Sequence, residues 1–288
     1  MIISVPASSA NMGPGFDTLG LALDVPFLCR LGPGKDRRVE AETHPTVVAF
    51  RSFGGVGPVS IKTSIPSGRG LGFSGAARVA GLVAACVQQH GPRLDLSAHL
   101  SRVFAQAADM EGHGDNVAAS IYGGCVAAAG RRVVSVPMPL EPAIVVWIPS
   151  SQTSTSTSRK ALAPLVSRDD AVFNVARTAI LVAALAGGDI AALRDATQDR
   201  LHQDVRFRLA PQCRVALLSM LQAGAWSAWL SGSGPTVAAM CAPHDAARIM
   251  AALPPGGRAH VLEIDRVGVK LLPATADVSS ENRQPLGW

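Results

Sequence analysis

The chain has 288 residues, of which 48% are hydrophobic and 16% are charged, and its formal net charge is +5. This composition predicts a soluble globular protein with one large or two modest domains, and it excludes an intrinsically disordered chain. The basic residues are scattered, without a Lys/Arg block, so we expect no nucleic-acid partner and favour a basic cleft for a small anion.

The cysteines and the apolar runs bear on the cell compartment. Five cysteines lie far apart among apolar residues: Cys29, Cys86, Cys125, Cys213 and Cys241. This pattern indicates buried thiols in a reducing cytoplasm. Residues 1–6 lack the basic and long apolar segments of a signal peptide. The apolar runs at 79–87 and 181–186 are too short for a membrane span and predict buried helices. We therefore expect a cytoplasmic protein with no membrane partner.

The chain begins with a predicted strand over residues 2–6, followed by a loop of small residues and glycines. The turn at 13–15 would present the amide of Asn11 and the carboxylate of Asp17 from a rigid backbone. A plain loop in which Asp17 caps the next segment is the alternative. Residues 25–62 alternate apolar and polar side chains and predict a β-rich region.

Residues 65–77 form the segment around which the rest of the chain is organised. Gly68, Gly70 and Gly72 alternate, so consecutive backbone N–H groups can converge on an anion. A helix predicted over 76–86 would point its N-terminus at that anion, and Ser74 could cap the helix or ligate a magnesium ion. The spacing matches neither the Walker nor the Rossmann pattern. The alternative is a glycine-rich surface turn before a buried helix, because the spacing alone does not distinguish the two.

A second helix is predicted over 94–110, with Asp95 or Ser97 as its N-cap. Four polar side chains then fall within six residues: Glu111, His113, Asp115 and Asn116. Any one of these alone would be interpreted as a helix cap.

The second half of the chain opens with a strand that ends near residue 149. The Ser/Thr-rich segment 150–160 predicts a mobile lid, a domain hinge or a passive linker. Further predicted elements follow in order: a helix over 169–186, a helix ending near 211, two strands joined by a glycine turn within 226–240, a helix over 243–253, a strand over 259–265 and a frayed tail after 274.

Three segments resemble the motifs of the GHMP kinases. Residues 7–24 are similar to the homoserine kinase motif P-A-[ST]-S-A-N-L-G-P-G-F-D-T-L-G-L-A-L. The glycine loop resembles P-x-x-x-G-L-G-x-S-x-A, and residues 230–236 resemble L-S-G-[AS]-G-P-T, which packs against the phosphate loop in that family. Residues 111–124, 169–186 and 202–211 also resemble segments of the homoserine kinase branch.

The resemblance implies an α+β fold in two parts. Domain 1–150 would resemble ribosomal protein S5 domain 2, domain 151–288 would be ferredoxin-like, and ligands would meet between them. It implies transfer of the ATP γ-phosphoryl group to the side-chain hydroxyl of L-homoserine, giving O-phospho-L-homoserine on the route to threonine. Magnesium and a homodimer are implied as well. A different small hydroxy acid or alcohol as acceptor, and a non-catalytic homologue, stay open as alternatives.

The resemblance also assigns roles to individual residues. Ser74 and Glu111 would hold Mg²⁺, and Asn11 would orient the attacking hydroxyl without a dedicated base. The residues implied at ATP are Pro66, Ser67, Gly68, Arg69, Gly70, Leu71, Gly72, Phe73, Ser74, Gly75 and Ala76. Those implied at the amino-acid substrate are Asn11, Asp17, His113 and Asn116, with Arg177 and Arg206 on its carboxylate.

The chain departs from the family at two places in the glycine loop. Phe73 and Gly75 flank Ser74 where the family usually has G-L-G-S-S-A-A. We expect Phe73 either to pack against protein or to reshape the nucleotide pocket. The backbone donors of the loop do not depend on that side chain.

Overall fold

The computed structural model describes residues 1–33, 38–91, 93–151 and 155–274. Its first strand, β1 (Ile2–Ala10), is buried at every residue. The sequence predicted a strand only as far as Pro6, but β2 (Leu19–Leu31) pairs with β1 as far as Ala10, with a register shift between Pro6 and Ala7. The loop that carries Asn11 therefore begins at the buried end of a long strand.

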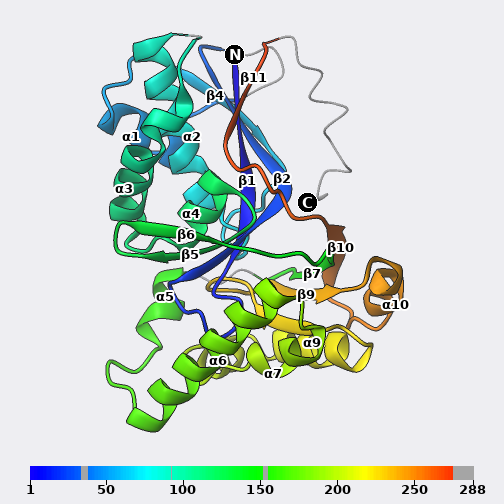
Figure 1. The fold of residues 1–288 in the computed structure, drawn as a ribbon. Coiled ribbons are helices and arrows are strands. Elements are labelled where there is room, and N and C mark those ends of the chain that lie inside the picture. Colours follow the sequence, from blue (N-terminus) through cyan, green and yellow to red (C-terminus); the bar gives the residue numbers. More distant parts are fainter. Residues whose placement is uncertain (34–37, 92, 152–154, 275–288) are drawn as a thin grey trace.

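The first sheet is antiparallel and has the order β11-β1-β2-β4-β3, with β5 paired to β2 and β6 paired to β5. Its remaining strands are β3 (Arg38–Val39), β4 (Val59–Thr63), β5 (Cys125–Ala129), β6 (Arg132–Val136) and β11 (Lys270–Leu272). Helices lie along one face of this sheet (Figure 1). They are α1 (Pro45–Ser52), α2 (Phe73–His90), η1 (Leu96–His99), α3 (Leu100–Glu111) and α4 (Asp115–Tyr122).

Helix α1 lies inside the region that was predicted to be β-rich, so that prediction is wrong there. Pro45 occupies the first helical position, and the His44 side chain accepts a hydrogen bond from the Thr46 N–H at 3.2 Å. These are start signals for a helix. Helix α2 begins earlier and ends later than predicted, and the single helix predicted over 94–110 is divided into η1 and α3, with Asp95 as the N-cap of η1.

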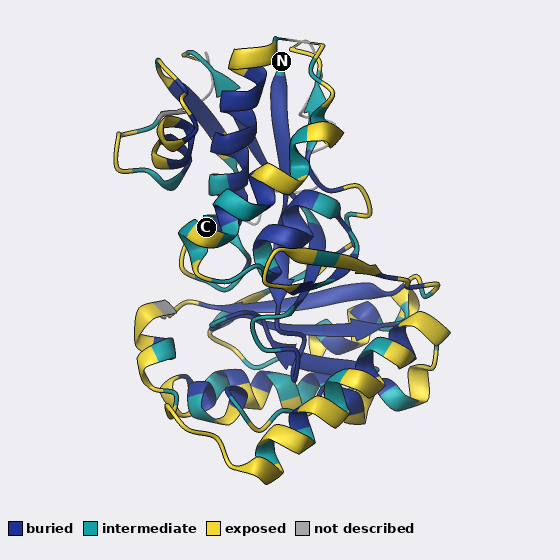
Figure 2. Ribbon diagram, turned by 60° about the vertical axis from the view of Figure 1, so that its left-hand side comes forward, coloured by how far each residue is buried: buried dark blue, intermediate teal, exposed yellow. Residues whose placement is uncertain are grey.

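Helix α2 is the centre of the N-terminal core, and its apolar residues between Ala76 and Val87 are buried (Figure 2). Gly81, a helix-weakening residue near the middle of α2, has a packing reason. A Cβ atom at Gly81 would lie 2.1 Å from the carbonyl oxygen of Thr46. Glycine therefore allows α1 to pack directly on α2.

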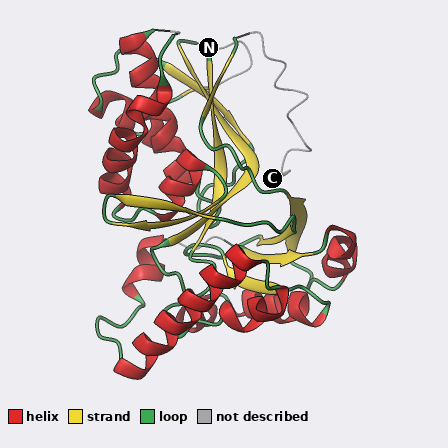
Figure 3. Cartoon of the chain, viewed as in Figure 1, coloured by secondary structure: helices red, strands yellow, loops and turns green. Residues whose placement is uncertain are grey.

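The second sheet is antiparallel with the order β10-β7-β9-β8. Its strands are β7 (Ala143–Pro149), β8 (Ser227–Leu230), β9 (Val237–Cys241) and β10 (Gly257–Leu262). The helices of this half are α5 (Thr155–Lys160), α6 (Arg168–Gly187), α7 (Ile190–Ala196), α8 (Gln203–Leu209), α9 (Pro211–Gln222), η2 (Pro243–Asp245) and α10 (Ala246–Ala251). The mixture of helices and antiparallel strands is clear in Figure 3, as an α+β fold requires.

The two sheets do not divide the chain at residue 150. Strand β7 precedes that point yet belongs to the second sheet, and β11 returns from the end of the chain to pair with β1 in the first sheet. The Ser/Thr-rich segment also differs from its prediction, because residues 155–160 form α5 rather than a loop. Residues 152–154 and the tail 275–288 lie outside the described residues.

Helix α6 is only partly buried, whereas its apolar run was predicted to be buried. Within the predicted run 181–186, Leu181, Ala184 and Leu185 pack in the core, whereas Ala183 and Ala186 are exposed. By length and composition alone α6 could cross a membrane, and 22% of its most apolar window is buried. All five cysteines are buried and free, as predicted.

Candidate active site

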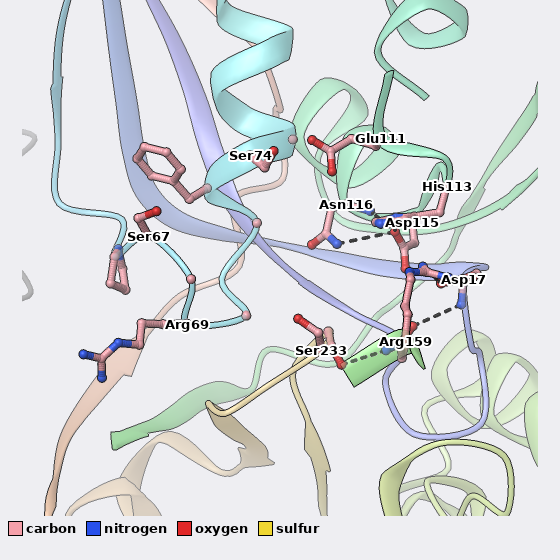
Figure 4. A pocket seen from close by; sticks show the side chains of 18 of the residues that line it. Asp17, Ser67, Arg69, Ser74, Glu111, His113, Asp115, Asn116, Arg159 and Ser233 are labelled. Atoms are coloured by element: carbon pink, nitrogen blue, oxygen red, sulfur yellow. Dashed lines mark hydrogen bonds and ion pairs between the residues drawn. The ribbon is translucent and has the colours of Figure 1, made fainter. Parts of the chain in front are cut away.

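A cleft of about 710 Å³, counting the space open to solvent, lies where the two sheets meet. Six segments line it: the loop after β1, the glycine loop, residues 111–116, α5, α8 and the turn between β8 and β9 (Figure 4). The cleft therefore gathers the segments that the sequence singled out.

The glycine loop has the backbone that an anion site needs. Gly68, Gly70 and Gly72 have φ angles of 69°, 77° and 71°, which favour glycine. No side chain among the described residues caps α2, and its first turn lines the cleft. Unpaired N–H groups at a helix N-terminus attract phosphate. Ser74 does not cap the helix, so that alternative is wrong.

The turn between β8 and β9 packs directly on this loop, as the resemblance implied. A Cβ atom at Gly70 would lie 2.3 Å from the Ser231 carbonyl oxygen. The Ser231 hydroxyl donates to the Gly70 carbonyl at 2.5 Å, and the Thr236 N–H donates to the Arg69 carbonyl at 3.3 Å. The second sheet thus holds the glycine loop in shape.

Three predicted ATP residues do not present their side chains to the phosphates. The Arg69 guanidinium donates to the Pro149 carbonyl and points away from Ser74 (Figure 4). Leu71 and Ala76 are buried in the core beneath the loop. Their contribution is to the shape of the loop.

Ser74 and Glu111 face each other at the start of α2 and the end of α3 (Figure 4). A hydroxyl and a carboxylate are the hard oxygen donors that Mg²⁺ prefers. The Glu111 Oε1 atom is buried. It lies in an ion pair with Arg78, which also donates to the Ser74 hydroxyl. These donors fit a cation next to phosphates.

The loop after β1 is held in an unusual backbone conformation. Asn11, Met12 and Asp17 have φ angles of 72°, 46° and 56°, which are uncommon for residues other than glycine. The Asn11 amide supports this shape, because its oxygen accepts from the Asp17 N–H at 3.1 Å and its nitrogen donates to the Gly232 carbonyl at 3.0 Å. Asn11 thus ties the loop to the turn between β8 and β9.

Asp17 does not cap a helix, because its carboxylate is bound by Arg159 of α5. Arg159 donates to both oxygens, at 2.6 and 2.9 Å. The sequence prediction missed this arginine. Its only signal was a basic residue at the end of a Ser/Thr run, which carries no information about a partner 142 residues away.

Arg206, a predicted site residue, does line the cleft and is 4% exposed. Its guanidinium donates to the Gly232 carbonyl and to His202 Nδ1, both at 3.0 Å. Burial lowers the pKa of Arg206 to about 10, which leaves it charged at neutral pH. Both arginines contact Phe16, whose ring centroid lies 5.2 Å from the Arg206 guanidinium and 5.7 Å from that of Arg159.

His202 holds Arg206 in place from a fully buried position. Its Nε2 donates to the Gly13 carbonyl at 2.8 Å, so Nδ1 is the nitrogen that accepts from Arg206. Burial lowers the pKa of His202 to about 4. The imidazole is therefore neutral at physiological pH and can accept this hydrogen bond.

The polar segment before α4 is also in the cleft. Asp115 is 1% exposed and its Oδ1 contacts His113 Nδ1 and the Asn116 N–H, both at 2.7 Å. Asn116 Oδ1 accepts from the Ser8 hydroxyl at 2.9 Å. Ligand atoms of Asp17, His113 and Asp115 lie within 4.8 Å of one another. This acidic group can receive a cation, and its neighbouring arginines can receive an anion.

The structure does not bring Arg177 to the cleft. Its guanidinium lies 4.9 Å from the ring centroid of Phe173, and it is not among the lining residues. Helix α5 contributes Arg159 to the wall of the cleft, whereas no residue of α6 is among the lining residues.

Comparisons with known proteins agree with this arrangement. The model of the GHMP kinases N terminal domain matches residues 41–124, and the GHMP kinases C terminal model matches residues 181–255, together more than half of the chain. The chain belongs to the GHMP kinase family. This confirms the predicted fold class.

Three homoserine kinases are similar to this family member. A protein of Thermus thermophilus is 38% identical, over 90% of this chain and 94% of the relative. That of Moorella thermoacetica is 38% identical, over 83% and 87%. The crystal structure of homoserine kinase from Cytophaga hutchinsonii superposes with a TM-score of 0.82 at 26% identity, and the match covers 94% of this chain and 97% of that one.

Proposed function

We propose that this GHMP kinase is a homoserine kinase, which transfers the γ-phosphoryl group of ATP to the side-chain hydroxyl of L-homoserine. The observation that carries the proposal is the pairing of charges at one end of the cleft. Arg159 and Arg206 both contact Phe16, and Asp17 lies next to His113 and Asp115. A free amino acid carries one carboxylate and one ammonium group, so this end is complementary to it.

The carboxylate of the substrate would bind the two guanidinium groups. A bidentate contact to arginine fixes orientation as well as charge. The ammonium group would bind Asp17, with His113 and Asn116 beside it. In the absence of substrate, Arg159 and Asp17 satisfy each other, so the amino acid would replace an internal ion pair with two of its own.

The distance between the polar end and the glycine loop favours a short acceptor. The Asn116 side-chain oxygen lies 3.1 Å from the point where a Cβ of Gly72 would be, and its Cβ lies 3.4 Å from the corresponding point at Gly75. The substrate-binding segment and the phosphate loop are therefore in contact. A hydroxyl that reaches the phosphates from an amino acid held here must be only a few bonds from its α-carbon, as in homoserine.

The nucleotide end would bind ATP through the backbone of residues 66–76, with the phosphates at the start of α2. Ser74 and Glu111 would hold Mg²⁺, which would supply positive charge to offset the negative charge that develops on the phosphates. Phosphoryl transfer depends mainly on positioning. Asn11 would orient the acceptor hydroxyl with the second N–H of its amide, since the first is bonded to Gly232. We assign no dedicated base.

Two alternatives make different predictions. A kinase for a neutral alcohol has no use for Arg159 and Arg206, and a non-catalytic homologue has no use for Ser74 and Glu111.

The cytoplasmic location and the homodimer stay predictions. Sedimentation of the purified chain would test the dimer.

Coupled measurement of ADP release tests the function. L-homoserine is compared with 4-hydroxybutyrate, which lacks the ammonium group, and with 3-amino-1-propanol, which lacks the carboxylate. Threonine, mevalonate and shikimate serve as other acceptors. We expect high kcat/KM for L-homoserine alone. Equal turnover of 4-hydroxybutyrate or mevalonate would contradict the amino-acid site, and ADP release with none of them would support the non-catalytic homologue.

A further inference from the structure

Arg78 contacts both residues that we assign to the metal. It lies one helical turn beyond Ser74 on α2, so the two side chains share a face of the helix. One of its terminal nitrogens, Nη1, donates to the Ser74 hydroxyl and forms the ion pair with Glu111. The side chains of Arg78 and Glu111 are 22% and 12% exposed, so water screens this pair only partly.

The contact joins a single guanidinium nitrogen, Nη1, to the Glu111 carboxylate. Arg78 Nε has no hydrogen-bond partner among the described residues, and Glu111 Oε1 accepts no hydrogen bond of normal geometry from them. The Asp17–Arg159 pair, by contrast, uses both nitrogens and both oxygens. A one-atom contact constrains the guanidinium less and costs less to separate.

The location of the pair affects cation binding. A carboxylate already neutralised by a guanidinium attracts a metal ion less strongly, and a hydroxyl oxygen that accepts from Arg78 directs a lone pair away from the cleft. Removing the guanidinium alone would leave Glu111 shielded from water without a partner, which is unfavourable. Nucleotide-free protein therefore benefits from Arg78, and a metal ion competes with it.

We propose that Arg78 is an internal counter-ion of the metal site, which holds Ser74 and Glu111 while nucleotide is absent and is displaced from them when metal and nucleotide bind together. This inference rests on the proposed function, because it takes Ser74 and Glu111 as the metal-binding residues. Its consequence is that Arg78 lowers the affinity for the metal–nucleotide complex and stabilises the empty site.

Calorimetric titration with ADP tests the inference, once with excess Mg²⁺ and once with EDTA. The ratio of the two dissociation constants is the gain in affinity due to metal. Arg78→Met keeps the length of the side chain and removes its charge. Arg131→Met is the matched control, since Arg131 also pairs with an acidic residue, Asp109, but on the surface. Arg78→Lys keeps the charge and serves as a second variant if Arg78→Met does not fold.

We expect Arg78→Met to increase the metal-dependent gain by roughly three- to tenfold, the range for loss of one partly shielded ion pair, and to lower the melting temperature in EDTA. Arg78→Lys should give a smaller increase, and Arg131→Met should give none. An unchanged or reduced gain in both Arg78 variants would overturn the inference.

A third variant, Glu111→Gln, separates failure of the inference from failure of the proposed function. If Glu111→Gln removes the metal-dependent gain while the Arg78 variants match the wild type, only the counter-ion role is wrong. If Glu111→Gln keeps the full gain, the metal site is wrong and the inference falls with it.

Discussion

The Arg159 guanidinium binds both carboxylate oxygens of Asp17, at 2.6 and 2.9 Å, and so joins α5 of the C-terminal half to the loop after β1. The pair is partly exposed, with side-chain exposures of 37% and 32%. Both side chains also line the cleft. This location favours a role in binding an amino acid, whose two charges would replace the pair.

Substitution of Arg159 tests that role directly. Arg159→Met should raise the KM for L-homoserine by about tenfold or more, because a carboxylate contact is lost, and should leave the KM for ATP nearly unchanged. Arg177→Met is the matched control and should affect neither constant, since Arg177 lies outside the cleft lining. Steady-state kinetics with each substrate varied in turn measures both KM values for the two variants. A larger increase of the KM for L-homoserine in Arg177→Met would support the carboxylate-binding role that the sequence resemblance gave to Arg177.

Glu111→Gln should lower kcat by orders of magnitude at saturating Mg²⁺ without unfolding the protein, since a metal-binding charge is lost where charge develops in the transition state. Glu42→Gln is a suitable control, because Glu42 is an exposed residue paired with Arg51 on the surface. Circular dichroism melts of both variants check the fold. Normal turnover in Glu111→Gln would show that Glu111 does not bind the metal ion.

Phe73 provides a test of the departure in the glycine loop. Its ring packs edge-on against Phe27 and His44, with centroid distances of 5.7 and 6.0 Å, and also lines the cleft. Phe73→Ser should lower the free energy of unfolding by roughly 3 kcal/mol and leave the KM for ATP unchanged. Phe73→Leu keeps apolar volume and should lose less stability. A lower KM for ATP in Phe73→Ser, with an unchanged melting temperature, would show that the ring occupies nucleotide space.

His202 predicts how stability depends on pH. Burial lowers its pKa from the usual 6.5 to about 4, so between these values the unfolded chain binds more protons than the folded one. The free energy of unfolding must then fall as the pH is lowered through this window, by at most about 3 kcal/mol.

Urea unfolding at several pH values across this window measures the dependence. His202→Gln removes the titrating group, so its unfolding free energy should vary less with pH than that of the wild type, whatever its absolute stability. Equal pH dependence of the two proteins would mean that other groups are responsible.

The amino-acid sequence by itself determined the features that depend on neighbouring residues. Alternating glycines before an Ala-rich helix predicted the anion site at the start of α2, and the cluster at 111–116 predicted a polar wall. Arg206 was assigned from the family resemblance of residues 202–211, and it lines the cleft. For the glycine loop and the 111–116 cluster, a few consecutive residues set the backbone geometry, so the local pattern is sufficient.

Only the tertiary structure decided which side chains from distant segments meet. Arg159 reaches Asp17 because α5 forms a wall of the cleft, whereas Arg177 on α6 packs against Phe173. Arg78 faces Glu111 because α2 and α3 pack side by side. Such pairs depend on how helices and sheets bury their apolar faces against each other, and that packing is distributed over the whole chain rather than encoded near either residue.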